Sequence, residues 1–106
     1  MKRGTVVWVD LSDTTPPEMG KVRPGVVISG ATHNETLATV VVVPTSSLAP
    51  EIWPLRIAIG RFAGKESYAI IPGMRQVRKG RLRGVVGQLS PDNLALLDSS
   101  VDAYLG

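Results

Sequence analysis

Short runs of apolar residues alternate with turn-forming residues along most of the chain, a pattern typical of a protein built mainly from β-strands. The run 39–43 has a threonine followed by four valines, and so many β-branched residues without a polar side indicate a strand buried on both faces. The run 55–59 alternates, as a half-buried strand does. We expect strands at 6–9, 24–28, 39–43, 55–59, 67–71 and 84–89, and a short further pairing around Val77.

The last part of the chain has the period of a helix. Ser90 is a typical N-cap, Pro91 suits the first helical position, and Asp92 suits the positive end of the helix dipole. An apolar stripe with spacings of 3, 4 and 4 follows at Leu94, Leu97, Val101 and Leu105. This spacing predicts one amphipathic C-terminal helix.

The remaining segments read as loops and turns. The stretches 14–20 and 48–54 each contain two prolines, and 31–35 reads as a polar turn. No helix is expected between strands, which excludes a βαβ dinucleotide-binding fold. We therefore expect one mainly β domain over 1–106, an antiparallel, strongly bent sheet or small barrel capped by the C-terminal helix.

Composition narrows the function classes. The 106 residues include no cysteine, which excludes disulfides, thiolate catalysis and Cys-ligated zinc. The apolar runs are far shorter than the roughly 18 residues of a membrane span, so we expect a soluble, cytoplasmic protein. The net charge is +3, and five of the 12 cations lie in the nine residues 75–83. Such a cluster indicates either a nucleic-acid-binding surface or a solvated charged loop.

Arg23 and Thr45 are the candidate catalytic residues. Arg23 precedes Pro24, which forces an extended backbone at the edge of a strand, and Thr45 follows the valine strand through Pro44. If the two strands are neighbours, a guanidinium and a hydroxyl can bind one phosphodiester together and stabilise its developing charge. The alternatives are a surface ion pair of Arg23 with Glu18 or Asp10, and a turn-capping role for Thr45 with Ser46 and Ser47.

The sequence gives little support for histidine-based or metal-dependent catalysis. A single histidine, His33, excludes a two-histidine acid–base mechanism, and we interpret it as a surface residue. The acidic residues are scattered without the spacing of a metal site, so we expect catalysis without a metal or other cofactor. Among the aromatic residues, we interpret Trp8 as core, whereas Trp53 in a proline-rich loop is the better candidate for binding a base or a partner protein.

The chain resembles the MazF/PemK toxins of bacterial type II toxin-antitoxin systems. The resemblance covers nearly the whole chain in order: Lys2-Arg3-Gly4, a strand ending in Asp10-Leu11, Glu18, the segment 21–28 with its Arg-Pro, Asn34, Val-Val-Val-Pro-Thr-Ser up to Ser46, Met74-Arg75 and the closing helix. Its most specific parts are the Arg-Pro strand and the Thr-Ser after the long strand.

This resemblance implies a CcdB/PemK-type barrel similar to an SH3 fold, and a homodimer. It implies a metal-independent endoribonuclease that cuts single-stranded RNA by attack of the 2′-hydroxyl, leaving a 2′,3′-cyclic phosphate and a 5′-hydroxyl. The family's arginine and threonine correspond to Arg23 and Thr45, and the segment 13–22 helps to cover the RNA and the antitoxin groove. RNA contacts are expected from Glu18, Lys21, Ser46, Arg75, Gln76, Arg78 and Lys79. The expected inhibitor is an antitoxin with a disordered, acidic tail.

Two departures leave the general acid and base unassigned. Many relatives have an acidic or polar residue and a glutamine where this chain has Pro72-Gly73-Met74, and some have a histidine at Pro17. Two alternative functions stay open. One is a toxin that, like the related CcdB proteins, binds gyrase without nuclease activity, and the other is a passive RNA-binding barrel.

Overall fold

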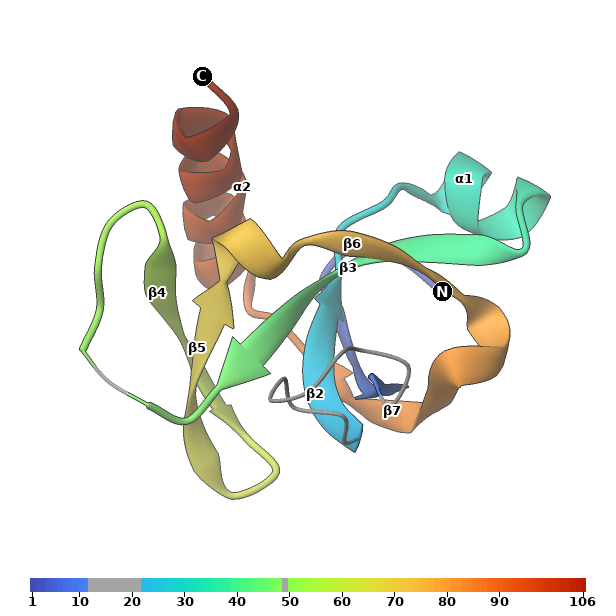
Figure 1. Cartoon of the computed structure of the whole chain (residues 1–106), viewed down its shortest axis with the longest axis horizontal. Coiled ribbons are helices and arrows are strands. Elements are labelled where there is room, and N and C mark those ends of the chain that lie inside the picture. Colours follow the sequence, from blue (N-terminus) through green and yellow to red (C-terminus); the bar gives the residue numbers. More distant parts are fainter. Residues whose placement is uncertain (12–21, 49) are drawn as a thin grey trace.

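The computed structural model describes residues 1–11, 22–48 and 50–106. The described part contains β1 (Thr5–Asp10), β2 (Val22–Val27), α1 (Ala31–Thr36), β3 (Thr39–Ser46), β4 (Arg56–Phe62), β5 (Lys65–Ile70), the 3₁₀ turn η1 (Ile71–Gly73), β6 (Arg75–Arg78), the 3₁₀ turn η2 (Lys79–Arg81), β7 (Leu82–Gln88) and α2 (Pro91–Leu105). The mainly β fold with a C-terminal helix is confirmed (Figure 1). In this part of the chain, no helix has both the length and the apolar composition needed to cross a membrane.

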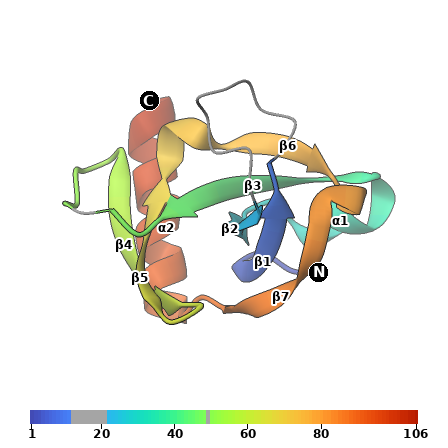
Figure 2. The ribbon, with the colours of Figure 1, turned by 60° about the horizontal axis from the view of Figure 1, so that its bottom comes forward.

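The strands form one curled antiparallel sheet of seven strands in the order β4-β5-β3-β2-β1-β7, with β6 pairing to β3 off this path. One edge of β3 pairs with β2, and the other edge pairs first with β6, from Thr39 to Val42, and then with β5 at Thr45 and Ser46. Figure 2 shows the sheet curling so that its strands enclose an interior. The long valine strand is therefore the centre of the fold.

The two faces of β3 supply two separate cores. Val42 belongs to a cluster inside the curl, and its neighbour Val43 belongs to a second cluster that Leu97 of α2 also joins. Both valines and Val40 have no exposed surface, while Val41 is half-buried. The prediction of a strand buried on both faces is thus confirmed, since successive side chains of a strand point to opposite sides.

Helix α2 begins as the sequence predicts. The Ser90 side chain accepts a hydrogen bond from the backbone N–H of Asn93 at 3.1 Å, and Pro91 is at the start of the helix. Leu97 is fully buried and Leu94 and Val101 pack against the same core, whereas Leu105 is 69% exposed. The expected apolar stripe was therefore wrong in its last member.

A bidentate ion pair joins the start of the chain to α2. The two terminal nitrogens of Arg3 donate to the Asp98 carboxylate at 2.8 and 2.7 Å. These hydrogen bonds raise the pKa of Arg3 above its usual value. Since both side chains are well exposed, we attribute only a small stabilisation to the pair.

The segment read as a polar turn at 31–35 is the helix α1, so that prediction was wrong. Asn34 on this helix is 4% exposed, and its side-chain amide donates to the backbone oxygens of Met1 and Ser29 at 2.9 and 3.0 Å. A short polar helix held by side-chain hydrogen bonds has no apolar period, and the sequence pattern therefore could not reveal it.

The β4–β5 hairpin ends in a tight turn whose tip lies close to β7. Its turn has two residues, Ala63 and Gly64, both with positive φ (55° and 78°), between the paired residues Phe62 and Lys65. Positive φ at both central residues gives the turn a backbone twist that matches the twist of the two flanking strands. The Phe62 ring lies against β7, since a Cβ built on Gly87 would come within 3.3 Å of it. The tip of the hairpin is thereby held toward β1 and β7.

Candidate active site

Arg23 and Thr45 lie at the same end of two paired strands. β2 and β3 are antiparallel, with Gly25 opposite Pro44 and Val26 opposite Val43. The Thr45 hydroxyl donates a hydrogen bond to the backbone oxygen of Pro24 at 2.8 Å. The two strands are neighbours, which meets the condition on which a joint role of Arg23 and Thr45 depends. Thr45 and Ser46 are the last residues of β3 itself, because both pair with β5, and so neither lies in a turn after the strand as expected.

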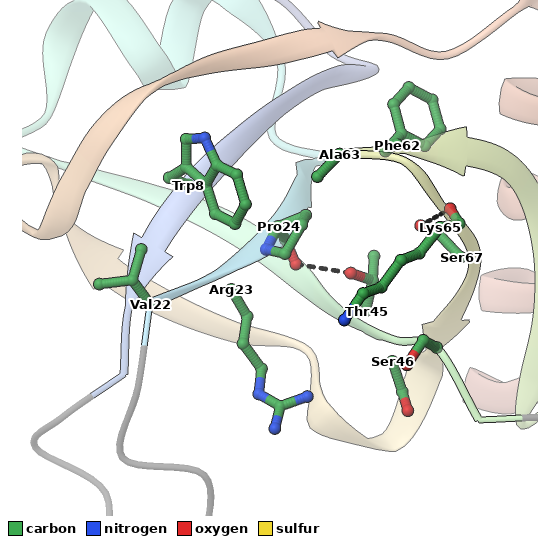
Figure 3. A pocket seen from close by; sticks show the side chains of 11 residues that line it. Trp8, Val22, Arg23, Pro24, Thr45, Ser46, Phe62, Ala63, Lys65 and Ser67 are labelled. Atoms are coloured by element: carbon green, nitrogen blue, oxygen red, sulfur yellow. Dashed lines mark hydrogen bonds between the residues drawn. The ribbon is translucent and has the colours of Figure 1, made fainter.

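Both residues line one open pocket of about 400 Å³. Figure 3 shows its walls: Trp8 from β1, Arg23 and Pro24 from β2, the end of β3, and the tip of the β4–β5 hairpin. The lining consists of Trp8, Val22, Arg23, Pro24, Thr45, Ser46, Ser47, Phe62, Ala63, Lys65 and Ser67. The pocket therefore combines two cations, four hydroxyl-bearing residues and two aromatic rings.

The Arg23 side chain is half-buried and extends from the edge of β2 (Figure 3). Its Nε is shut off from solvent and has no hydrogen-bond partner in the described part of the chain. Asp10, which the sequence offered as a partner for Arg23, forms an ion pair with Arg83 at 2.8 Å instead. A buried donor without a partner is costly, and an anionic ligand in the pocket would supply the missing acceptor.

Thr45 is 5% exposed, and its single hydroxyl proton is directed to Pro24. Donating to a phosphoryl oxygen therefore requires this hydroxyl to turn away from the Pro24 carbonyl. The neighbouring Ser46 hydroxyl accepts a bond from the backbone N–H of Leu48 at 3.0 Å, which leaves its own proton to donate. The Thr45 hydroxyl therefore already donates its proton within the protein, whereas the Ser46 hydroxyl can donate its proton to a ligand.

The sequence missed three residues of this pocket, Phe62, Ala63 and Lys65. The Gly60 and Gly64 positions indicated a turn, but which end of the sheet this turn would meet depends on how the strands are ordered. The interpretation of Trp8 as core was also wrong. It is half-buried, belongs to neither core cluster and faces the pocket.

The basic cluster lies elsewhere. Arg75, Gln76 and Arg78 line a second pocket of about 410 Å³, together with Thr39, Val77 and Arg81. This second pocket lies beside the start of β3, whereas Arg23 lies near the end of β3. The six residue-to-residue steps from Thr39 to Thr45 span roughly 20 Å of strand. Lys79 donates to the backbone oxygen of Asn34, which ties it to α1. Of the expected RNA contacts, only Ser46 shares the pocket of Arg23 and Thr45, while Glu18 and Lys21, like the segment 14–20, lie outside the described residues.

His33 lies on α1 with Nε2 3.4 Å from the Thr39 hydroxyl, far from the Arg23 pocket along β3. In the described ranges, no three His, Asp or Glu side chains gather as a group able to bind a metal.

Gly73, in the Pro72-Gly73-Met74 segment that departs from many relatives, packs closely against Pro44 of β3. A Cβ at this position would lie 2.8 Å from Cγ of Pro44, the residue before Thr45, so a larger residue would require the Pro44 ring or the 71–73 turn to move. We expect Gly73→Ala to lower the free energy of unfolding by about 1–3 kcal/mol, as overpacking does. Gly80→Ala is the matched control because open space surrounds Gly80. Equal unfolding midpoints of the two variants in urea would contradict the close contact with Pro44.

Comparison with known proteins gives one consistent result. The model of the family described as "PemK-like, MazF-like toxin of type II toxin-antitoxin system" matches residues 2–105. Curated relatives named Endoribonuclease MazF occur in Staphylococcus saprophyticus, at 29% identity, and in Staphylococcus epidermidis, at 30% identity. Each alignment spans 110 positions and covers 100% of this chain and 92% of the relative.

Solved structures show the same fold. MazF from Deinococcus radiodurans superimposes with a TM-score of 0.84 at 21% identity, over 100% of this chain and 96% of the other. An endoribonuclease from a mycobacterial species, solved in complex with its cognate antitoxin, gives a TM-score of 0.83 at 22% identity, over 100% and 95% of the two chains.

Proposed function

The chain belongs to the PemK-like, MazF-like toxins of type II toxin-antitoxin systems, and we propose that it is an endoribonuclease in which Arg23 and Thr45 act on one phosphodiester of single-stranded RNA. The observation that supports this most is the shared pocket. Two paired strands bring these side chains to one open surface, and the arginine has a buried donor with no partner among the residues that the structure describes. The fold and the curated relatives named as endoribonucleases point the same way.

The reaction we propose is transesterification within the substrate. The ribose 2′-oxygen forms a bond to the adjacent phosphorus and the bond from phosphorus to the 5′-oxygen breaks. The proton of the 2′-hydroxyl passes to a base, and the departing 5′-oxygen receives one. The products are a 2′,3′-cyclic phosphate and a 5′-hydroxyl. DNA lacks the nucleophile and should resist cleavage.

Arg23 has the role of binding the non-bridging oxygens and stabilising the charge that develops on them. An arginine side chain carries a positive charge, and its planar fork of donors matches two phosphate oxygens. Thr45 donates to a phosphoryl oxygen once its hydroxyl turns from Pro24. Because the substrate supplies both nucleophile and leaving group, and the guanidinium supplies the positive charge, we expect cleavage to persist in EDTA.

Replacing Thr45 by alanine should reduce cleavage by about 10²-fold, the typical cost of one lost oxyanion donor. It should also lower stability by about 1 kcal/mol, because the Pro24 oxygen loses its hydrogen bond. Thr45→Ser keeps the hydroxyl and should retain most of the activity. Equal initial rates for the wild type and Thr45→Ala would leave Thr45 with only its structural bond to Pro24.

One experiment separates the three functions considered. Purified protein is incubated with mixed-sequence RNA in EDTA, and the products are separated by size and by mobility. Site-specific fragments support the nuclease, and intact RNA with a mobility shift supports a passive RNA-binding barrel. Intact RNA without a shift supports a toxin directed at a protein. The gyrase-binding alternative is not favoured, since the matched family and the named relatives are those of MazF.

We propose that the partners are single-stranded RNA, a cognate antitoxin with an acidic, disordered tail, and a second copy of the chain in a homodimer. The mycobacterial structure with its antitoxin and the net charge of +3 support the antitoxin. One toxin domain over 1–106, working in the cytoplasm, completes the proposal. Sedimentation at micromolar concentration should give a dimer, and monomers alone would count against that part.

A further inference from the structure

An aromatic wall of the pocket has no role in the proposed chemistry. Trp8 on β1 is paired across the strands with Pro24 on β2, so its indole lies next to the proline that follows Arg23. Its strand neighbours Val7 and Val9 point into the core inside the curl, which directs Trp8 to the opposite face. Val6 on that face is covered by the core that α2 completes, whereas Trp8 is left half-buried at the pocket.

The wall of the pocket opposite Trp8 is formed by the tip of the β4–β5 hairpin. Figure 3 shows Phe62 and Ala63 across the pocket from Trp8, with Pro24 between them. The tight turn at Ala63 and Gly64 and the contact of Phe62 with Gly87 hold this wall in place. An apolar part of the pocket is therefore bounded by the indole, the proline ring and the hairpin.

Positive charge borders this space on the side away from Trp8. Figure 3 shows the Arg23 guanidinium below Pro24 and the Lys65 side chain running from the hairpin toward Thr45. A phosphate held by Arg23 brings its own nucleoside into the same pocket, and a volume of about 400 Å³ is within the usual range of small-ligand sites. An aromatic face beside a phosphate-binding cation is the arrangement that single-strand-binding proteins use for a base.

We propose that Trp8 is a specificity-determining residue of the cleavage reaction, on which the base next to the scissile phosphate stacks. This inference rests on the proposed function, because the phosphate held by Arg23 places the base. Stacking is tolerant of base identity by itself, and the confined space between Trp8 and the hairpin is what selects among bases. Loss of the indole should weaken RNA binding by about 10- to 100-fold, the usual effect of removing one stacked aromatic residue.

The chain offers an internal control, because it contains two tryptophans and Trp53 is not part of the pocket lining. Trp53→Phe leaves Trp8 as the sole indole fluorophore, and Trp8→Phe leaves Trp53. The probe is a mixed-sequence single-stranded RNA with 2′-O-methyl riboses, which cannot be cleaved. A second probe has the same backbone with abasic nucleosides.

We expect the 2′-O-methyl RNA to quench the fluorescence of Trp8 and to leave that of Trp53 unchanged, and the abasic backbone to quench neither. Quenching of Trp53 alone, or equal quenching by the abasic backbone, would overturn the proposal. Quenching of Trp8 by an acidic peptide but not by RNA would also overturn it, by assigning the indole to a protein partner.

A second measurement uses cleavage. Trp8→Leu keeps an apolar side chain against Pro24 and removes the stacking surface, and circular dichroism checks that the variant folds. We expect KM to rise about 10- to 100-fold with little change in kcat, and sequencing of the cut 5′ ends should show a relaxed preference at one position beside the cut. An unchanged KM and an unchanged set of sites would exclude Trp8 as a specificity determinant. Quenching of Trp8 without any cleavage would leave the base platform standing and reject the nuclease instead.

Discussion

Replacement of Arg23 by alanine is expected to lower RNA cleavage by at least about 10³-fold, since the side chain supplies both the charge and the paired donors for the scissile phosphate. Among residues 1–11, 22–48 and 50–106, no other cation extends from β2 beside Arg23. Lys65 approaches the pocket from the opposite wall, and the arginines of β6 line a different pocket near the start of β3. The measurement is the initial rate of cleavage of a defined RNA in EDTA.

The same variant should remain folded. The Nε of Arg23 is buried with no hydrogen-bond partner in the described ranges, so its removal should relieve an unfavourable desolvation of about 1–3 kcal/mol. We therefore expect the urea midpoint to stay equal or to rise. Arg23→Lys is the control that keeps the charge without the planar fork, and its rate should fall between those of the wild type and the alanine variant. Cleavage by Arg23→Ala at the parental rate would remove Arg23 from the mechanism.

Truncation of Leu97 to alanine is expected to have the largest effect on stability. Leu97 is fully buried where α2 meets the sheet, and it shares a core with Val43 and Ile57. Removing a buried leucine side chain costs about 2–5 kcal/mol, a large fraction of the roughly 5–15 kcal/mol by which a domain of this kind is stable. Urea unfolding followed by circular dichroism gives this difference.

Leu105 provides a control on the same stripe of the same helix. Its side chain is 69% exposed, so Leu105→Ala should change the free energy of unfolding by less than about 0.5 kcal/mol. Comparable losses in the two variants would mean that the whole stripe is buried in solution, in contrast to the structure.

The elements predicted well from sequence are those set by local chemistry. Four consecutive valines leave no polar side, and they form the strand that both cores share. Ser90 and Pro91 fix the start of α2 because capping depends on residues close in sequence. The joint site of Arg23 and Thr45 was predicted on the condition that their strands pair. Arg23 precedes one apolar run and Thr45 follows the next, so antiparallel pairing of the two strands brings the residues to the same end.

The elements that were missed depend on contacts between distant segments. α1 is held by hydrogen bonds from Asn34 to Met1 and Ser29, which no local period records. Trp8 lies in an apolar strand, but it is outside the core to which α2 contributes. Val6, on the same face of β1, belongs to that core, whereas Trp8 stays half-buried. Residues of the basic stretch 75–83 were expected to contact the RNA, but they line a different pocket from Arg23. The two pockets are separate because β6 pairs with the first half of β3 and β5 with its last residues.

The central claim is that Arg23 and Thr45 hold the same phosphodiester of an RNA strand. The most direct test is a crystal structure of the protein with an RNA that carries its mapped cleavage site and a single 2′-deoxynucleotide before the scissile bond, which blocks the reaction. We predict the scissile phosphate in the Arg23 pocket on the side away from Trp8 (Figure 3), with its oxygens within hydrogen-bond distance of the Arg23 guanidinium and the Thr45 hydroxyl. A scissile phosphate bound against Arg75 and Arg78, or anywhere out of reach of Arg23, would contradict the account.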